Sequence, residues 1–69
     1  MNMGKKGDIH YGQEVKKRVE KRGMTIAEFG RRINRSRNAV YSIFNRKFID
    51  IPLLRKISEV LDFDFIHDL

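Results

Sequence analysis

The segment "RRINRSRNAVYSIFNRK", residues 31–47, combines a strong positive charge with an apolar stripe. It contains six Lys or Arg side chains and no Asp or Glu. Its apolar side chains recur at the spacing of one helix face: Ile33, Val40, Ile43 and Phe44. A helix with such a stripe packs it against a core and turns its other side to solvent. The segment is therefore expected to be helical, with one buried face and a polar, positively charged remainder.

The first half of this segment predicts the end of one helix, a tight turn and the start of another helix. Asn34 tolerates the left-handed conformation that ends a helix, and Ser36 is a favourable N-cap for the next one. The preceding helix is expected to begin at Thr25, which is followed three residues later by Glu28 as in a capping box. Only about three residues then connect the two helices, which forces a sharp crossing. Gly30 has no Cβ and would let the two backbones approach closely.

Three more helices are expected outside this pair. A first helix is predicted over residues 10–22, where apolar side chains recur four residues apart and Gly23 can end the helix. Asp50 is a favourable N-cap for a fourth helix, and Pro52 is tolerated in its first turn. Asp64 can cap a last helical turn. No strand-like alternation competes with these signals, so the sequence predicts a compact all-α fold of five short helices.

Length and composition indicate one small, cysteine-free domain. A chain of 69 residues can bury only about 60% of its unfolded surface and leaves no room for a second core. Residues 1–8 contain two Gly and two Lys without an apolar period, so we expect a flexible arm there and one domain over residues 9–69. The absence of Cys excludes disulfides and thiolate metal sites and fits a reducing compartment. Without a membrane-spanning apolar run or a signal peptide, a cytoplasmic location is expected.

The charge of the chain is unevenly distributed. Residues 1–49 carry thirteen Lys or Arg and four Asp or Glu, whereas residues 50–69 carry two and five, so the net charges are +9 and −3. A basic body next to an acidic end is typical of a protein that meets a polyanion on one side. The alternative is that the positive charge only keeps a small protein soluble.

Two short helices joined by a tight turn, with the second basic and capped by Ser, form a helix-turn-helix pattern. In such a motif the second helix, here about residues 36–45, lies in the major groove of double-stranded DNA. A step of 100° per residue places Asn38, Tyr41, Ser42 and Asn45 opposite the apolar stripe, and Arg37 lies at the exposed start of the helix. The predicted base-reading residues are Arg37, Asn38, Tyr41 and Ser42. A merely solvated helix would usually carry Glu and Lys on that face, and this one carries neither.

A second group of residues surrounds that face and is predicted to contact DNA phosphates. These residues are Thr25, Arg32, Arg35, Ser36, Asn45, Arg46 and Lys47. The alternative for the basic members is ordinary surface charge. Capping alone would explain Thr25 and Ser36, although a cap can also present its hydroxyl to a phosphate.

The sequence resembles the Cro/XRE family of helix-turn-helix transcriptional regulators, whose DNA-binding domain is lambda-repressor-like. The resemblance extends over residues 11–69. It rests on "GQEVKKRVEKRGMTIAEFGRRINRSRNAVYSIFNRK" (12–47) and on the closing segment "LLRKISEVLDFDF" (53–65). It implies base reading at Arg37, Asn38 and Ser42 with Tyr41 adjacent, and it places Ser36 where relatives commonly contact phosphate.

Four positions depart from the family pattern. Ile26 replaces a polar residue that often touches phosphate, and Arg35 replaces a commonly apolar residue of the turn. Phe44 and Val19 stand where relatives often carry a buried Glu–Arg ion pair. An apolar pair in that place need not destabilise the fold.

A homodimer is expected, at least on DNA, because one reading helix covers only a few base pairs and two half-sites raise specificity. Candidate dimer residues are Phe48, Ile49, Phe63, Phe65 and Ile66, although core packing is the competing explanation for each. The alternative function is an antitoxin or adaptor-like protein-interaction module that retains the DNA-binding fold. RNA binding is weaker, since exposed stacking aromatics on a sheet are not expected.

An enzyme is the least favoured class. His10 and His67 lie at opposite ends of the chain, and neither has a nucleophile or a metal-ligand cluster beside it. No Gly-rich phosphate loop is present. The sequence therefore predicts no catalytic residues, no metal and no cofactor. A basic first helix on a membrane surface is also disfavoured, because its apolar face is too small.

Overall fold

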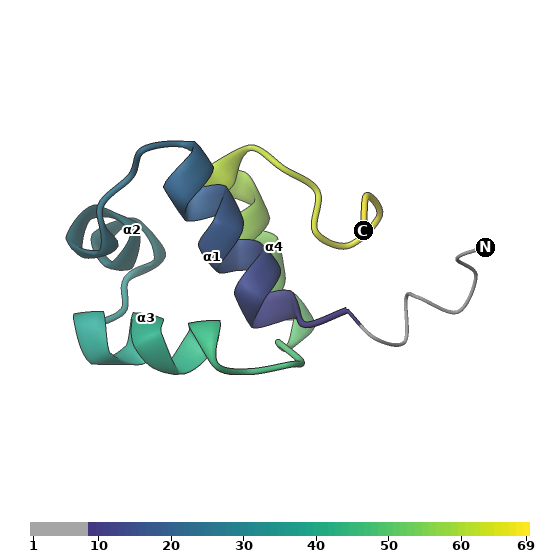
Figure 1. Ribbon diagram of the computed structural model, residues 1–69, viewed down its shortest axis with the longest axis horizontal. Coiled ribbons are helices and arrows are strands. Elements are labelled where there is room, and N and C mark those ends of the chain that lie inside the picture. The colour runs from purple at the N-terminus through teal and green to yellow at the C-terminus, as the bar shows by residue number, and fades with distance from the viewer. Residues whose placement is uncertain (1–8) are drawn as a thin grey trace.

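The computed structural model describes residues 9–69, and within this range the chain forms four α-helices (Figure 1). Their bounds are α1 (Tyr11–Lys21), α2 (Ile26–Ile33), α3 (Arg37–Phe44) and α4 (Ile51–Leu61). The all-α prediction is confirmed, but the count of five helices is wrong. The flexible arm was predicted for residues 1–8, which lie outside the described part of the chain.

The expected fifth helix is a single turn. The Asp64 carboxylate does cap it, because Oδ1 accepts the N–H groups of Ile66 and His67, each at 2.9 Å. One backbone bond, from Asp68 N to Asp64 O at 2.9 Å, closes the turn. A helix becomes stable only when further bonds are added cooperatively to such a nucleus. The capping residue was therefore identified correctly, while the length of the element was not.

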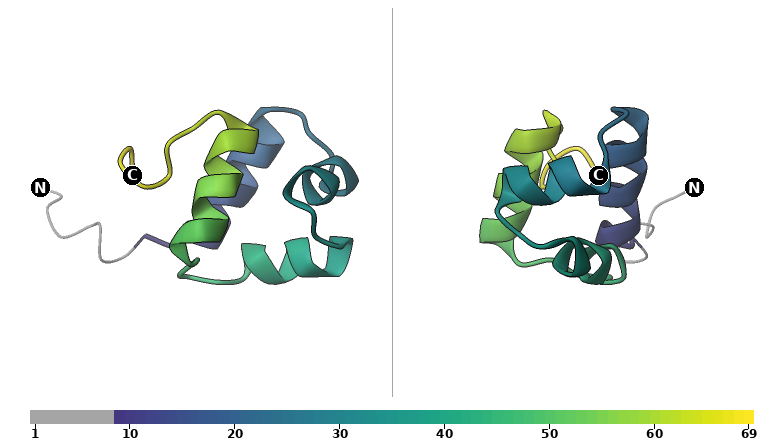
Figure 2. Two further views of the ribbon diagram at one scale, coloured as in Figure 1. Left: turned by 180° about the vertical axis from the view of Figure 1, so that it is seen from behind. Right: turned by 90° about the vertical axis from the view of Figure 1, so that its left-hand side faces the viewer.

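The core is built from one face of every helix. Figures 1 and 2 show α1 and α4 side by side, with α2 and α3 packed against one end of this pair. The largest fully buried side chains are Phe29, Phe65, Ile43, Ile57, Leu61, Val15, Val19 and Val40. The rings of Phe29 and Phe44 stack with centroids 6.2 Å apart, which joins α2 to α3. The apolar stripe that the sequence predicted for α3 is thus confirmed as its core face.

The predicted N-caps are confirmed, with one change of detail. The side-chain oxygens of Thr25, Ser36 and Asp50 each accept the backbone N–H three residues on, at 3.0, 3.2 and 3.2 Å. The Glu28 carboxylate does not complete the capping box; its Oε2 instead accepts a bond from Arg32 Nε at 3.1 Å. The carboxylate therefore pairs with a cation one turn further along α2 rather than with a backbone N–H at the helix start.

The turn between α2 and α3 has the geometry that the sequence predicted. Asn34 has φ 63° and ψ 45°, the left-handed conformation. Arg35 N then donates to Gly30 O at 2.8 Å. A Cβ built on Gly30 would lie 2.8 Å from Arg35 O and 3.2 Å from a methyl carbon of Val40. The absence of a side chain at Gly30 therefore sets how closely the turn and α3 approach α2.

Replacement of Asn34 should separate backbone preference from side-chain contact. Asn34→Ala is expected to lower the free energy of unfolding by about 1 kcal/mol, because a Cβ without a local polar group is strained in the left-handed region. Asn34→Gly should be nearly neutral, since Gly adopts this conformation without strain. Urea denaturation of the two variants measures the difference. Equal stability of the Ala and Gly variants would contradict this explanation of the turn.

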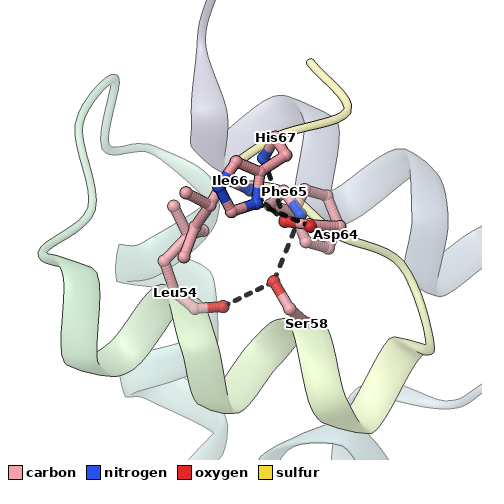
Figure 3. A network of polar contacts seen from close by, with 6 residues as sticks. All are labelled: Leu54, Ser58, Asp64, Phe65, Ile66 and His67. Atoms are coloured by element: carbon pink, nitrogen blue, oxygen red, sulfur yellow. Dashed lines mark hydrogen bonds and ion pairs between the residues drawn. The ribbon is translucent and has the colours of Figure 1, made fainter.

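The segment after α4 closes one side of the core. Ser58 Oγ donates to Leu54 O at 2.8 Å and accepts the N–H of Phe65 at 3.2 Å, so one hydroxyl ties this segment to α4 (Figure 3). Phe65 is buried, and its ring meets the ring of Phe63 edge to face at 4.8 Å between centroids. The Arg18 guanidinium of α1 lies 4.0 Å from the Phe63 centroid. Core packing, rather than a dimer surface, therefore accounts for Phe65.

The C-terminal turn should respond to acid through Asp64. The hydrogen bond from the backbone N–H of His67, and then that from the His67 side chain, lower the pKa of Asp64 below its ordinary value of 3.8. Because the pKa is lower in the folded state, the carboxylate stabilises the turn above pH 3.8 and ceases to do so as the pH falls through the lowered value. We expect the amides of Ile66 and His67 to lose hydrogen-exchange protection in that window. Asp64→Asn should abolish this pH-dependent loss of protection, whereas Asp68→Asn should leave it unchanged. If the loss persists in Asp64→Asn, another group is responsible for it.

Candidate nucleic-acid interface

The outer face of α3 presents the side chains that the sequence predicted as base readers. Arg37, Asn38, Tyr41 and Ser42 are all exposed, and half of the Tyr41 surface is accessible. Figures 1 and 2 show α3 along one edge of the molecule, with no other described element beyond it. The helix therefore has an open side along its whole length, and the four residues lie on it.

These four side chains are free to bind a partner. Within residues 9–69, none of them makes a side-chain hydrogen bond or an ion pair. The position of Arg37 is also unfavourable for the helix itself, because a cation in the first turn opposes the helix dipole. Helix stability thus gives no reason for a positive charge there, while an external anionic or hydrogen-bonding partner does.

The predicted phosphate-binding residues surround this face, and all of them are exposed. Arg35 and Ser36 lie at the start of α3, and Asn45, Arg46 and Lys47 follow its end. Thr25 caps the start of α2, and Arg32 lies in its last turn. All seven residues therefore lie at the ends of these two helices. Their surface charge is only partly neutralised.

All four cations of this group already have a contact within the protein, and for Lys47 it is the Phe48 ring, whose centroid lies 5.7 Å from Nζ. Arg32 pairs with Glu28 at 3.1 Å, and Arg46 lies 4.0 Å from Asp50. Arg35 makes a long bond of 3.5 Å to the carbonyl of Asn34. These are exposed contacts, which contribute little stability and exchange easily for a phosphate. Arg35, which replaces a commonly apolar residue of the turn, thus places its charge beside the backbone, and its side chain stays in solvent.

The orientation of α3 is fixed by a junction with the start of α1, which sequence reasoning missed. Tyr11 N donates to Lys47 O and Gly12 N donates to Arg46 O, each at 2.9 Å. Gln13 Nε2 donates to Phe44 O at 3.0 Å. The first N–H groups of one helix and the last carbonyls of another usually lack partners. Here the first N–H groups of α1 bond to the segment that directly follows α3, and the Gln13 side chain satisfies the carbonyl of Phe44, the last residue of α3.

Gly12 makes this junction possible. A Cβ on Gly12 would lie 2.4 to 2.5 Å from the carbonyl oxygens of Ile43, Phe44 and Arg46, which no real Cβ tolerates. The sequence held one signal of this constraint: a glycine in the first turn of a predicted helix, where helix propensity offers no reason for it. His10 was also missed as the N-cap of α1; its Nδ1 accepts the N–H of Gln13 at 3.1 Å.

A groove with a volume of about 340 Å³ opens beside the reading face, between α1, α2 and α3. Lys16 lies on the α1 wall, Thr25 and Ile26 on the α2 wall, and Tyr41 and Asn45 on the α3 wall. We refer to it as the three-helix groove. Two predicted phosphate ligands and one predicted base reader therefore share its rim.

The floor of the three-helix groove is apolar. Val19 and Phe44 both line it, and both are buried. The structure thus contains an apolar pair at the two positions where the sequence suggested that one replaces a buried ion pair. Ile26, the other departure from the family pattern, lies on the adjacent wall and is partly buried against the core.

Residues 9–69 contain no group of three or more His, Cys, Asp or Glu side chains placed to hold a metal ion. No helix among these residues is long and apolar enough to cross a membrane.

Comparison with known proteins gives one match. The helix-turn-helix family model matches residues 15–66, which cover most of the chain and include all of α2, α3 and α4. No curated protein and no solved structure matches the chain. The matched range contains the tight turn at Asn34 and the open face of α3. The chain therefore belongs to the Cro/C1-type (XRE) helix-turn-helix family of DNA-binding domains.

Proposed function

We propose that this protein is a cytoplasmic, sequence-specific regulator of transcription of the Cro/XRE type, which reads the major groove of double-stranded DNA with α3. One observation carries the proposal: the outer face of α3 is open and bears Arg37, Asn38, Tyr41 and Ser42, whose side chains make no hydrogen bond within residues 9–69. Arg pairs well with guanine and Asn with adenine. Such a face suits base reading better than simple solvation.

In this proposal, specificity and affinity come from different residues. The four α3 side chains read bases. The surrounding ring (Thr25, Arg32, Arg35, Ser36, Asn45, Arg46 and Lys47) binds phosphates, which position the protein without reading sequence. The net charge of +6 supports this role, because neutralising phosphates releases counterions and makes binding salt-dependent.

We further propose that the protein binds DNA as a homodimer. Phe48 and Ile51 are the apolar side chains best placed for a self-contact, since 71% and 49% of their surfaces are exposed beside the end of α3. Together they expose roughly 200 Å², far less than the ~800 Å² per partner of a stable interface. The dimer is therefore expected on DNA, where two adjacent half-sites hold the copies together. Ile49, another dimer candidate from the sequence, is buried in the core.

The same exposed pair, Phe48 and Ile51, favours the second candidate function. An antitoxin or adaptor-like module would use such a patch, away from the α3 face, to bind another protein. The two functions differ in whether the protein binds DNA without a partner protein. A regulator binds its duplex alone, whereas an adaptor requires the partner chain.

Selection from a randomised duplex pool, followed by salt-titrated binding, tests the proposed function. We expect the selected duplexes to contain two-fold related half-sites and to bind at least about a thousandfold more tightly than random duplex at physiological salt. Equal affinity for selected and random duplexes would overturn sequence-specific reading. No binding to any duplex would overturn the DNA-binding proposal and favour the adaptor.

A further inference from the structure

We propose that the three-helix groove holds a phosphate of the DNA backbone and that Lys16 of α1 is the cation that binds it. This inference rests on the proposed function and extends the DNA-binding surface to a third helix. Ile26, on the α2 wall of the groove, replaces a polar residue that often touches phosphate in relatives, so its side chain supplies no such contact here.

The groove is continuous with the candidate interface. Thr25 and Asn45, two predicted phosphate ligands, lie on its α2 and α3 walls, and Tyr41 joins it to the reading face. A DNA strand that passes beside α3 within reach of both Thr25 and Asn45 must therefore cross the mouth of the groove. Lys16 lies on the remaining wall, so a phosphate at this place would meet side chains of all three helices.

Two features of the groove attract an anion, namely a lysine without an ion-pair partner and the start of a helix. Lys16 is exposed and has no ion-pair partner among the described residues 9–69, whereas its neighbour Lys17 is held by Glu14 at 3.2 Å. α2 begins at Ile26 on the adjacent wall, and the first N–H groups of a helix attract phosphate. Glu20 also lines the groove and opposes this attraction, but it balances Lys16 without pairing with it. Removal of the Glu20 charge should therefore strengthen binding.

The apolar floor strengthens the contact. Val19 and Phe44 place low-dielectric material under the groove, where a cation and a phosphate attract each other more strongly than in open water. The same floor offers apolar surface to the deoxyribose beside the phosphate. The groove thus matches a sugar-phosphate unit in both charge and polarity.

Lys16→Gln tests the inference, with Lys21→Gln as the matched control. Both variants remove one charge from α1, but Lys21 lies outside the groove and also has no ion pair within residues 9–69. We expect Lys16→Gln to weaken binding of the selected duplex about tenfold at 0.1 M salt and to reduce the slope of log K against log salt by about 0.9. Lys21→Gln should leave the slope unchanged, and Glu20→Gln should tighten binding.

A phosphate scan locates the contact. Single methylphosphonates, which are neutral, replace successive phosphates of the duplex. A methylphosphonate at one position should weaken duplex binding by the wild-type protein. The same duplex should bind Lys16→Gln no more weakly than the unmodified duplex does, because that variant has already lost the contact. Suppose that the wild-type protein binds the duplex, and that Lys16→Gln shows the same slope of log K against log salt and the same pattern of methylphosphonate effects. The inference about Lys16 is then overturned, while the proposed function stands. Absence of wild-type binding would overturn both.

Discussion

Gly12→Ala is expected to lower the free energy of unfolding by about 3 kcal/mol, a value at the upper end for an overpacked site. The added Cβ meets three backbone carbonyl oxygens at 2.4 to 2.5 Å, and backbone carbonyls cannot move aside as a flexible side chain would. A domain of this size is stabilised by only about 3 to 5 kcal/mol in total. The variant should therefore be largely unfolded at 37 °C, as measured by circular dichroism and urea denaturation.

Gly23→Ala is the matched control for this prediction. Gly23 has φ +71°, but a Cβ there would meet no atom within 4 Å. Only backbone strain opposes the substitution, so we expect the free energy of unfolding to fall by about 1 kcal/mol. In an unconstrained helix, Gly→Ala stabilises by roughly 0.5 to 1 kcal/mol. A Gly12→Ala protein that is as stable as the wild type would therefore contradict the α1–α3 junction.

Arg37→Ala is expected to remove about 1 to 3 kcal/mol of discrimination at one base position, a 5- to 150-fold loss of preference. The fold should be unaffected, because Arg37 is exposed, makes no ion pair within residues 9–69 and opposes the helix dipole at the start of α3. The measurement is repeated selection from the randomised pool, with thermal unfolding as a check on stability.

Lys47→Ala removes a predicted phosphate ligand and is the comparison for Arg37→Ala, which removes a predicted base reader. The side chain lies beyond the end of α3, and the backbone carbonyl that accepts the N–H of Tyr11 remains in the variant. Binding to all duplexes should weaken alike, with a salt slope smaller by about 0.9 and an unchanged base preference. If the two variants relax base preference equally, the division between base readers and phosphate ligands is wrong.

The local signals in this sequence were sufficient for most of the fold. Asn34, Thr25, Ser36 and Asp50 act through bonds that span at most a few residues, so their roles could be predicted from the chain alone. The stripe of α3 likewise follows from helical periodicity. The length of the last helical element was overestimated, since a good cap at Asp64 does not determine how far a helix continues.

Apart from the local N-cap at His10, the features that sequence reasoning missed depend on contacts between distant segments. Gln13 and Phe44 are 31 positions apart, and nothing local to either residue indicates that one binds the other. The constraint on Gly12 arises from three carbonyls of the α3 end, and the three-helix groove exists only once three helices have packed. Lys16 was therefore one of several lysines on a basic helix until the structure placed it beside Thr25 and Asn45.

Titration of the ¹⁵N-labelled protein with its selected duplex tests the central claim most directly, because it shows which residues meet DNA. We expect the largest amide shift changes from Arg37 to Ser42, smaller ones at Lys16, Thr25 and Asn45, and little change along the exposed side of α4. Shift changes concentrated on α4 or on the C-terminal turn, with α3 unaffected, would show that α3 is not the reading helix.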